Sequence, residues 1–139
     1  MNHTYISRSN YTKKKWYIID ANQKSLGRLA TLISIILQGK HKIDYEPSND
    51  LGDYLIVINA KNIIIDSWTT GHMKFHAFCP GRPGSSLKKI FERVPQKVLE
   101  SALKNMLPNG KRSIIQRRLK IYDDSNHPHQ AQKPILLEY

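Results

Sequence analysis

The first patterned stretch of the chain is an aromatic and β-branched run followed by a helical repeat. Residues 16–20, Trp-Tyr-Ile-Ile-Asp, predict a short buried strand. After a turn, apolar residues recur at spacings of three and four from Leu26 to Leu37, which predicts a helix with Ser25 at its N-cap. Gly39 supplies the left-handed residue that ends this helix. A strand followed by a helix is the beginning of a βαβ unit.

Two further apolar runs follow a polar stretch that contains Pro47 and Gly52. Residues 54–59 form a continuous apolar run, which is typical of a central strand in a parallel sheet, and residues 63–66 form another run after a short turn. The next segment, residues 67–86, is rich in glycine and proline. This composition predicts a long loop or arm that serves as a working surface.

The second half of the chain predicts two short helices, a basic helical segment and one more strand. The first helix has Leu87, Ile90, Phe91 and Val94 on one face. The second begins at Pro95, ends before Pro108, and is expected to bury Val98, Leu99, Ala102, Leu103 and Met106. The basic segment leads to a strand at residues 119–122, and the tail of residues 123–139 has little periodicity. The alternation of strands and helices favours an α/β fold with a mostly parallel sheet covered on both faces.

The length of 139 residues fits a single domain. We expect this domain at residues 16–139, with an extended C-terminal tail, after a basic N-terminal arm at residues 1–15. No apolar run approaches the ~20 residues of a membrane span, so no membrane partner is expected. The single cysteine, Cys79, forms no internal disulfide and supplies no cysteine-based zinc site, so neither a metal nor another cofactor is expected. No transit peptide is visible at the N-terminus.

The charge of the chain favours a polyanionic partner. There are 22 Lys and Arg residues against 11 Asp and Glu, which gives a formal charge of +11, and most of the excess lies after Thr70. Residues 109–122 contain five cations and no acidic residue: Lys111, Arg112, Arg117, Arg118 and Lys120. If Ile114, Ile115 and Leu119 turn inward, these cations form a basic ridge that follows a phosphate backbone. The alternative is an ordinary solvated face.

Other cations occur where a nucleic acid has easy access. They are Lys13, Lys14 and Lys15 in the arm, Lys40, His41 and Lys42 after the first helix, and Arg82, Lys88, Lys89 and Arg93 in the later loop and helix. Arg28 lies on the first turn of the first helix, beside Gly27. Either the guanidinium and the helix amides bind a phosphate, or the glycine only permits close helix packing.

Several residue patterns suggest an enzyme, but none has a complete set of partners. The Gly-rich loop at residues 81–86 lacks the Lys-Ser/Thr ending of a nucleotide-binding loop. Four aspartates lie near predicted strand ends: Asp20, Asp50, Asp53 and Asp66. They have no evident nucleophile or base, and roles in caps and turns explain them as well. His127 and His129 with Cys79 lack metal-ligand spacing, so contacts to RNA or to backbone are favoured for the histidines.

Sequence blocks in fixed order, spread over nearly the whole chain, carry a resemblance to a known family. The blocks are WYIIDA at residues 16–21, LGRLA at 26–30, GKHK at 39–42, GDYLIVINA at 52–60, MLP at 106–108 and LKIY at 119–122. They resemble the bacterial-type ribosomal protein thirteen of the large subunit. The loop at residues 82–84 and the ending at residues 127–134 look most like the cyanobacterial and plastid branch of that family.

This resemblance implies a three-layer α/β/α domain around a four-stranded, mostly parallel sheet, with no catalytic activity. It implies a structural constituent of the large ribosomal subunit that binds large-subunit ribosomal RNA and supports subunit assembly and translation. The partners would be that RNA and neighbouring large-subunit ribosomal proteins, and no homo-oligomer is expected. By motif position the RNA contacts fall on Arg28, Lys40, Lys42, Arg82, His127 and His129.

The chain departs from the family's pattern in its loops, and leaves the sheet and the first helix unchanged. The departures are Phe78, Cys79, Ser85, Asn105, the short segment Lys111-Arg112 and Asp124. The abundance of Ile, Lys and Asn, as expected from an AT-rich genome, and the plastid-like motifs favour a place in a plastid. A cyanobacterial cytoplasm is the alternative.

Two other functions compete with structural RNA binding. The first is a small α/β enzyme acting on a phosphorylated or nucleotide substrate, which needs a saturable site for a small ligand. The second is a basic DNA-binding module, although the chain has no helix-turn-helix or zinc-finger signature.

Overall fold

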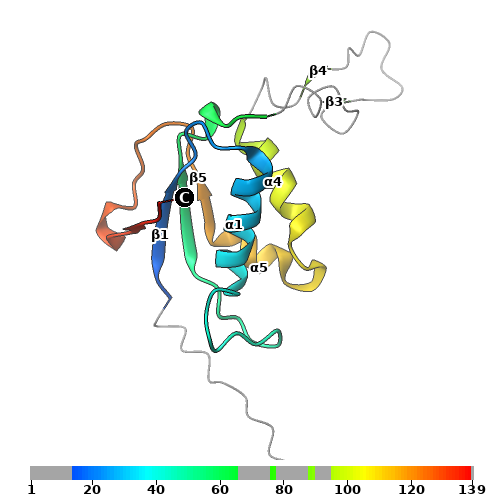
Figure 1. The fold of residues 1–139 in the computed structure, drawn as a ribbon, viewed down its shortest axis with the longest axis vertical. Coiled ribbons are helices and arrows are strands. Elements are labelled where there is room, and N and C mark those ends of the chain that lie inside the picture. Colours follow the sequence, from blue (N-terminus) through cyan, green and yellow to red (C-terminus); the bar gives the residue numbers. More distant parts are fainter. Residues whose placement is uncertain (1–13, 66–75, 78–87, 90–94, 139) are drawn as a thin grey trace, which may run out of the picture.

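The computed structural model describes residues 14–65, 76–77, 88–89 and 95–138, and a parallel β-sheet lies at its centre (Figure 1). The strand order is β5-β2-β1-β6. The strands are β1 (Trp16–Asp20), β2 (Tyr54–Ile58), β5 (Leu119–Ile121) and β6 (Ile135–Leu136), and each neighbouring pair is parallel. The prediction of an α/β fold with a four-stranded parallel sheet is therefore confirmed.

The two central strands show why the apolar runs behave as strands. β1 and β2 pair over their whole length, from Trp16 opposite Tyr54 to Asp20 opposite Ile58. Side chains alternate between the two faces of a strand, so Ile19, Leu55 and Val57 share the face that forms the main core. The residue between the last two, Ile56, is also fully buried, on the opposite face. A continuous apolar run in β2 thus reflects burial on both sides.

Helices cover one face of the sheet. They are α1 (Leu26–Gln38), α4 (Pro95–Met106) and α5 (Arg112–Arg117), the last preceded by the 3-10 turn η4 (Asn109–Lys111). The main core joins Leu29, Ile33 and Leu37 of α1 to Leu99 and Leu103 of α4. The predicted helices at these positions are confirmed, but Met106 was expected to be buried and is 43% exposed. The next residue, Leu107, is buried in the core in its place.

The order of the strands explains which segment covers which face. The chain moves from β1 to β2 to β5 in one direction and then returns across both central strands to β6. Because crossovers between parallel strands are right-handed, the outward path places α1, α4 and α5 on one face and the return path places the tail on the other. Figure 1 shows these helices on one side of the sheet, and the 3-10 turn η5 (Gln130–Gln132) of the tail, in orange-red, on the other. Both faces are covered, as predicted.

Two predicted elements differ from the structure, and one strand was not predicted. The run at residues 63–66 forms no extended strand in its described part, where η2 (Ala60–Asn62) precedes a single parallel bridge between Ile64 and Ser25. The fourth strand is β6, from the tail that showed no periodicity. The helix predicted over residues 87–94 is wrong at Lys88–Lys89, which form β4 and pair antiparallel with β3 (His76–Ala77). The remainder of that helix and most of the loop at 67–86 lie outside the described residues.

Details at the ends of α1 fit the sequence in part. Ser25 is the N-cap residue but its side chain makes no capping hydrogen bond, whereas Gly39, at φ 78°, accepts the left-handed conformation that ends the helix.

Within the described ranges, no helix has the length and apolarity needed to cross a bilayer.

We predict that Gly52→Ala severely destabilises the fold. A Cβ at this position would lie 1.8 Å from the Leu37 carbonyl oxygen, which belongs to the last turn of α1 and has little room to move. The expected loss is at least about 3 kcal/mol of unfolding free energy, measured by denaturant titration followed by circular dichroism.

Gly27→Ala is the matched control, because a Cβ there meets no atom within 4 Å. Alanine is the better helix former, so this variant should gain about 0.5–1 kcal/mol. Equal effects at the two glycines would show that the close approach of Gly52 to the last turn of α1 is not a constraint.

Candidate nucleic-acid interface

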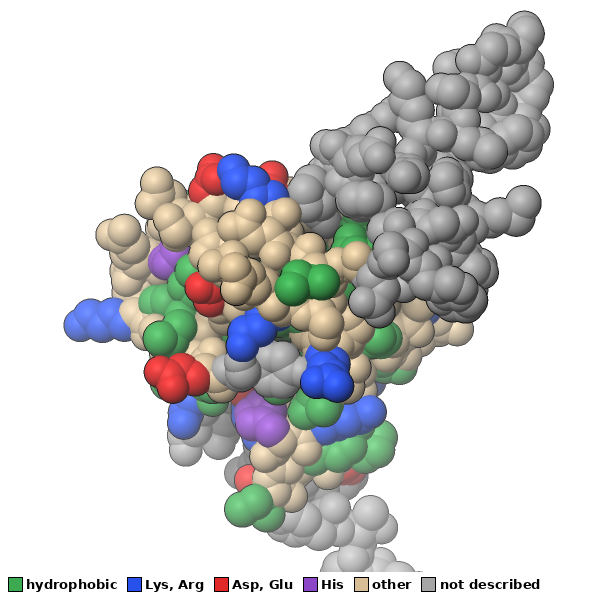
Figure 2. All heavy atoms as spheres, turned by 45° about the horizontal axis from the view of Figure 1, so that its top comes forward, with side chains coloured by type: hydrophobic (Ala, Val, Ile, Leu, Met, Phe, Trp, Pro, Cys, Tyr) green, Lys and Arg blue, Asp and Glu red, His purple; other side chains and the backbone are tan. Residues whose placement is uncertain are grey.

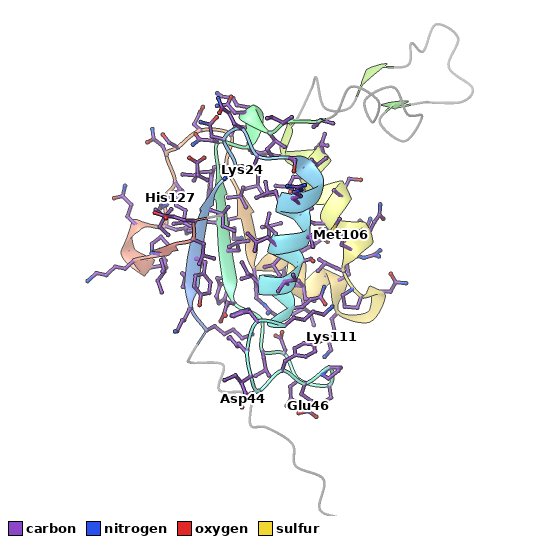
Figure 3. The ribbon with its side chains drawn as sticks, in the orientation of Figure 1. Lys24, Asp44, Glu46, Met106, Lys111 and His127 are labelled. Atoms are coloured by element: carbon purple, nitrogen blue, oxygen red, sulfur yellow. The ribbon has the colours of Figure 1, made fainter. Side chains whose placement is uncertain are left out.

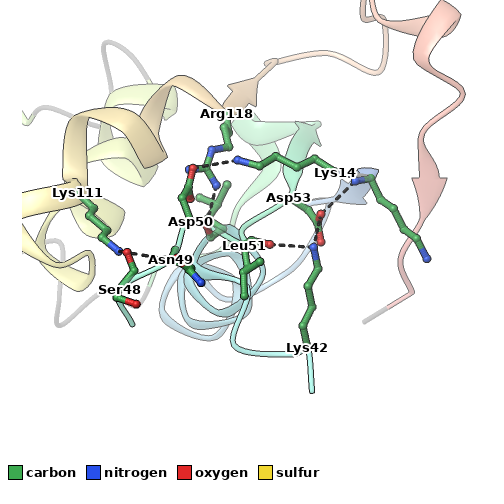
Figure 4. A network of polar contacts seen from close by, with 11 residues as sticks. Lys14, Lys42, Ser48, Asn49, Asp50, Leu51, Asp53, Lys111 and Arg118 are labelled. Carbon is green, nitrogen blue, oxygen red and sulfur yellow. Dashed lines mark hydrogen bonds and ion pairs between the residues drawn. The ribbon is translucent and has the colours of Figure 1, made fainter. Parts of the chain in front are cut away.

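The connection between α1 and β2, residues 40–53, is held in place by cations and carboxylates (Figure 4). At its end Asp53 is fully buried, and its Oδ1 accepts hydrogen bonds from the backbone N–H of Lys15 at 3.0 Å and from Lys42 Nζ at 2.7 Å. Lys42 Nζ also donates to the Leu51 carbonyl at 2.8 Å. The Lys42 ammonium, near the start of the connection, is therefore hydrogen-bonded to the residues at its end.

His41 lies beside the same buried carboxylate. Its Nε2 is 3.2 Å from Asp53 Oδ2, an atom that accepts no hydrogen bond from the described residues. The imidazole also meets the Tyr17 ring edge-on at a centroid distance of 6.2 Å. Burial and, after it, the charge of Asp53 raise the pKa of Tyr17. His41 keeps an exposed side, so it has both an internal contact and access to solvent.

Asp50 joins three segments that are distant in sequence. Its Oδ2 accepts a hydrogen bond from Lys14 Nζ at 2.9 Å, and its Oδ1 accepts one from Arg118 Nη2. Burial alone would raise the pKa of Asp50, but the hydrogen bonds from Arg118 and Lys14 outweigh it and lower that pKa below its ordinary value. Arg118 is only 4% exposed and also donates to the Leu37 carbonyl at 3.5 Å. This burial corrects the prediction that Arg118 belongs to an exposed basic ridge.

The fold also divides the rest of the ridge predicted between residues 109 and 122. Lys111 Nζ turns to the loop and donates to the carbonyls of Pro47 at 2.5 Å and Ser48 at 2.9 Å. Arg112 Nη2 donates to Asn109 Oδ1 at 2.6 Å. Lys111 and Arg112 are thus engaged within the protein, which a count of charges along the sequence does not reveal.

The apolar positions of that ridge behave differently from the expectation. Ile115 is buried and Leu119 packs against the core, but Ile114 was expected to turn inward and is exposed. A helix of six residues has only one side against the core, and Ile115 occupies it. Lys120 lies between Leu119 and Ile121 on β5, so alternation directs it to the face covered by the tail, where it is half-buried.

Four of the predicted contacts have exposed side chains and no hydrogen bond or ion pair from the side chain to the described residues: Lys15, Arg28, Lys40 and Arg117. Arg28 lies on the first turn of α1, Lys40 directly follows the cap of that helix, and Arg117 ends α5. The open space around Gly27 removes close helix packing as the reason for a glycine beside Arg28.

Some predicted contacts are not described by the structure. Lys13, Arg82 and Arg93 lie outside the described residues, and Lys88 and Lys89 are described only as the backbone of β4. Their assignment stays a prediction.

Sequence reasoning passed over other cations, chiefly Lys61, Lys97, Lys104 and Lys133, all of which are exposed. Lys61 pairs with Asp124, and this contact raises the pKa of the lysine. Lys97 and Lys104 are seven residues apart and so share one face of α4, a spacing that would have revealed them. Glu100 lies on the same face at three and four residues from them and offsets part of their charge.

The two histidines of the tail pack against aromatic side chains. His129 Nε2 is 2.9 Å from Tyr122 Oη, and its ring lies 5.5 Å from that of Trp16, which stacks on Tyr54. His127 Nδ1 accepts the backbone N–H of His129 at 3.2 Å. His127 thus contacts backbone, one of the two roles considered for these histidines, and the RNA contacts of His127 and His129 stay a prediction.

The residues that suggested an enzyme have structural contacts. Asp20 Oδ1 accepts hydrogen bonds from the Asn22 backbone N–H and from Asn59 Nδ2, both at 2.9 Å, as expected of a turn residue. Asp50 and Asp53 are held in the ion pairs described above, while Asp66 and Cys79 lie outside the described residues. In residues 14–65 and 95–138, no three His, Cys, Asp or Glu side chains are grouped as a metal site requires.

The surface does not present one continuous basic patch on the face seen in Figure 2. Lys and Arg side chains are interspersed there with acidic and hydrophobic ones. A nucleic acid bound to this face would therefore be held by separate cations, as a folded RNA with many phosphates at different angles permits.

Comparison with known proteins gives consistent results along the whole chain. The family described as "Ribosomal protein L13" matches residues 14–128. The "Large ribosomal subunit protein uL13c" of Trieres chinensis is 45% identical, over 99% of this chain and 98% of its own length. Proteins named "Large ribosomal subunit protein uL13" are 42% identical in Caldicellulosiruptor bescii, over 97% of this chain and 98% of their own, and in Acaryochloris marina, over 99% and 93%.

We predict that the Asp50 contacts stabilise the fold in a pH-dependent way. Asp50→Asn leaves the buried Arg118 without its counter-charge and should cost roughly 2 kcal/mol at pH 7. Because the pKa of Asp50 is lowered from 3.8 in the folded protein, its contribution is complete above that pH and is lost as the pH falls through the folded value. Unfolding free energies from pH 7 to pH 2 should therefore converge for the two proteins in acid.

Asp44→Asn is the control for this experiment, because Asp44 is exposed and forms no ion pair with the described residues. It should change the unfolding free energy by less than about 0.5 kcal/mol at neutral pH. A pH-independent difference between Asp50→Asn and the parent chain would contradict the ion-pair account.

We also predict that His129→Ala destabilises the tail. The variant loses the hydrogen bond to Tyr122 and the ring contact with Trp16, together worth about 1–2 kcal/mol. Hydrogen exchange should show faster exchange of the Leu137 amide, which is bonded to the Ile18 carbonyl in the pairing of β6 with β1. Gln130→Ala, at an exposed position of η5, should leave this exchange unchanged; unaltered exchange in both variants would argue against a structural role for His129.

Proposed function

This chain belongs to the ribosomal protein L13 family, and from this premise we propose that it is a constituent of the large ribosomal subunit that binds large-subunit ribosomal RNA and supports subunit assembly. The observation that carries the proposal is the match over residues 14–128, joined to relatives aligned over nearly their whole length. The charge of +11 fits a polyphosphate partner. Members of this family are structural ribosomal proteins and not enzymes, so the small-molecule enzyme considered above is set aside.

Exposed cations at separate points of the fold support RNA contact. Arg28 has the amides of the first turn of α1 beside it. Lys40 follows the C-terminal end of α1, and Arg117 is the last residue of α5. The charges of these side chains are available to a partner. In contrast, ion pairs or hydrogen bonds to carboxylates and carbonyls of the protein engage the charges of Lys14, Lys42, Lys111 and Arg118. Lys13, Arg82, Lys88, Lys89 and Arg93 remain proposed contacts on the grounds of charge and, for Arg82, of motif.

The domain organisation is also a proposal. A single domain at residues 16–139 follows an arm at residues 1–15, and the last two residues of that arm already contact the domain. Lys14 pairs with Asp50, and the Lys15 backbone donates to Asp53.

We place the protein in ribosomes of a plastid, with a cyanobacterial cytoplasm as the alternative. The similarity to the uL13c of Trieres chinensis supports the first, and that to the uL13 of Acaryochloris marina keeps the second open.

The test of the function is co-sedimentation of the tagged full chain with large subunits in the cells that make it. The chain should be recovered with the large subunit and should prefer folded ribosomal RNA to duplex DNA at matched salt. Recovery in the free fraction alone would overturn the proposal, and equal affinity for DNA would favour the DNA-binding alternative.

We predict that Lys40→Gln and Arg117→Gln weaken RNA binding without affecting the fold. Each removes one phosphate contact, so the slope of log K against log salt should become shallower by about 1 for each variant. Lys104→Gln, an exposed cation outside the proposed set, is the control and should leave the slope unchanged. Arg118→Gln should instead lower the unfolding free energy, because Arg118 is buried against Asp50.

A further inference from the structure

The connection between α1 and β2 ends in a tip that exposes apolar side chains. This loop tip consists of Ile43, Asp44 and Tyr45. Ile43 is fully exposed and Tyr45 is 37% exposed. Figure 3 shows Asp44 and Glu46 on the loop at one end of the domain, opposite the end that carries Lys24. Two apolar side chains within three residues are therefore exposed together, and neither belongs to the core of the domain.

The loop that carries the tip is held in one conformation. Successive turns are closed by hydrogen bonds from Lys42 N–H to the Gly39 carbonyl, from Tyr45 N–H to the Lys42 carbonyl and from Asn49 N–H to the Glu46 carbonyl. The Glu46 carboxylate accepts hydrogen bonds from Ser48 Oγ at 2.6 Å and Asn49 Nδ2 at 2.7 Å. A preorganised loop loses little conformational entropy when a partner binds, so less of the favourable free energy of its contacts is offset by the cost of ordering.

A shallow hollow adjoins the loop tip. Including its open side it encloses about 310 Å³. Its walls combine Tyr45, Pro47 and Ile115 with the charged Glu46, Asp50 and Lys111, and most of the exposed lining is polar. Tyr45 thus belongs both to the tip and to the wall of the hollow. An aromatic ring and prolines beside carboxylate oxygens suit a Lys or Arg side chain, because its apolar stem and its charged head need different contacts.

The charge around the loop tip differs from that of the rest of the chain. Residues 43–60 contain four of the 11 acidic residues and no Lys or Arg: Asp44, Glu46, Asp50 and Asp53. Asp50 and Asp53 are paired with cations inside the protein. Within the described part of the chain, Glu46 accepts hydrogen bonds from neutral donors only, and Asp44 is exposed at the tip, so both keep their negative charge. Of the cations beside the tip, Lys42 and Lys111 donate to Asp53 and to loop carbonyls, and the exposed Lys40 lies at the start of the connection. A phosphate approaching Asp44 would be repelled, whereas a cationic side chain would be attracted.

We propose that the loop tip and the adjoining hollow bind a Lys- or Arg-rich segment of a neighbouring protein in the ribosomal particle, while RNA is bound elsewhere on the domain. The inference rests on the proposed function in so far as the particle supplies this neighbour. An RNA base stacked on Tyr45 is the competing outcome, and the experiment distinguishes the two.

The test is site-specific photo-crosslinking in assembled large subunits. p-Benzoylphenylalanine replaces Ile43 in one full-length variant and Lys40, a proposed RNA contact, in another. After irradiation, position 43 should give an adduct with a protein, on a peptide that mass spectrometry shows to carry a net positive charge. Position 40 should give an adduct with RNA.

The outcomes separate this inference from the proposed function. An RNA adduct at position 43, or no protein adduct above that at position 40, overturns the inference and leaves the proposed function standing. Absence of the unmodified chain from large subunits overturns both.

A charge reversal tests the chemistry of the partner. Asp44→Lys, combined with the crosslinker at position 43, should keep its circular dichroism spectrum and lose about fivefold in yield of the protein adduct, since one attractive ion pair becomes a repulsion. Glu100→Lys, an exposed reversal on α4, is the matched control and should leave the yield unchanged. An unchanged yield in Asp44→Lys would show that the partner segment is not recognised by its positive charge.

Discussion

The buried carboxylate of Asp53 is the contact on which the arrangement of β1, α1 and β2 depends. It accepts the backbone N–H of Lys15, which immediately precedes β1, and the ammonium of Lys42, which follows α1, and it directly precedes β2. A carboxylate without any exposed surface is tolerated only when it is paired and hydrogen-bonded. The starts of both central strands and the exit from α1 are therefore set by a single side chain, and Asp50 extends the same arrangement to β5 through Arg118.

This arrangement changes the meaning of the chain's positive charge. Lys14, Lys42, Lys111 and Arg118 neutralise acids or cap loop carbonyls, so they shape the protein before any partner arrives. The exposed cations are therefore positioned by a fold that the internal cations stabilise. Some of the cations thus stabilise the connection between α1 and β2, and others remain available for phosphate. The composition alone does not distinguish the two groups.

How far the sequence predicts the structure depends on how local the relevant interaction is. β1, α1, β2 and α4 were predictable because each buries its own periodic apolar residues. β6 was not, because its two residues are exposed and it exists only through pairing with a strand more than a hundred residues earlier. The role of Arg118 was hidden for the same reason, since Asp50 is 68 residues away in the chain. The exposed cations at the helix ends were accessible to sequence reasoning, since helix ends are recognisable from the caps.

The pairing of β6 with β1 has a consequence for biosynthesis. β1 leaves the ribosome that makes this chain more than one hundred residues before β6 does. Until residues 135–136 emerge, the outer edge of β1 keeps its backbone amides and carbonyls unpaired. The ring of Trp16 likewise lacks its contact with His129 until that residue has been made. The nascent chain therefore carries an open sheet edge while the more than one hundred residues between the two strands are made, and the emergence of residues 135–136 is the event that closes it.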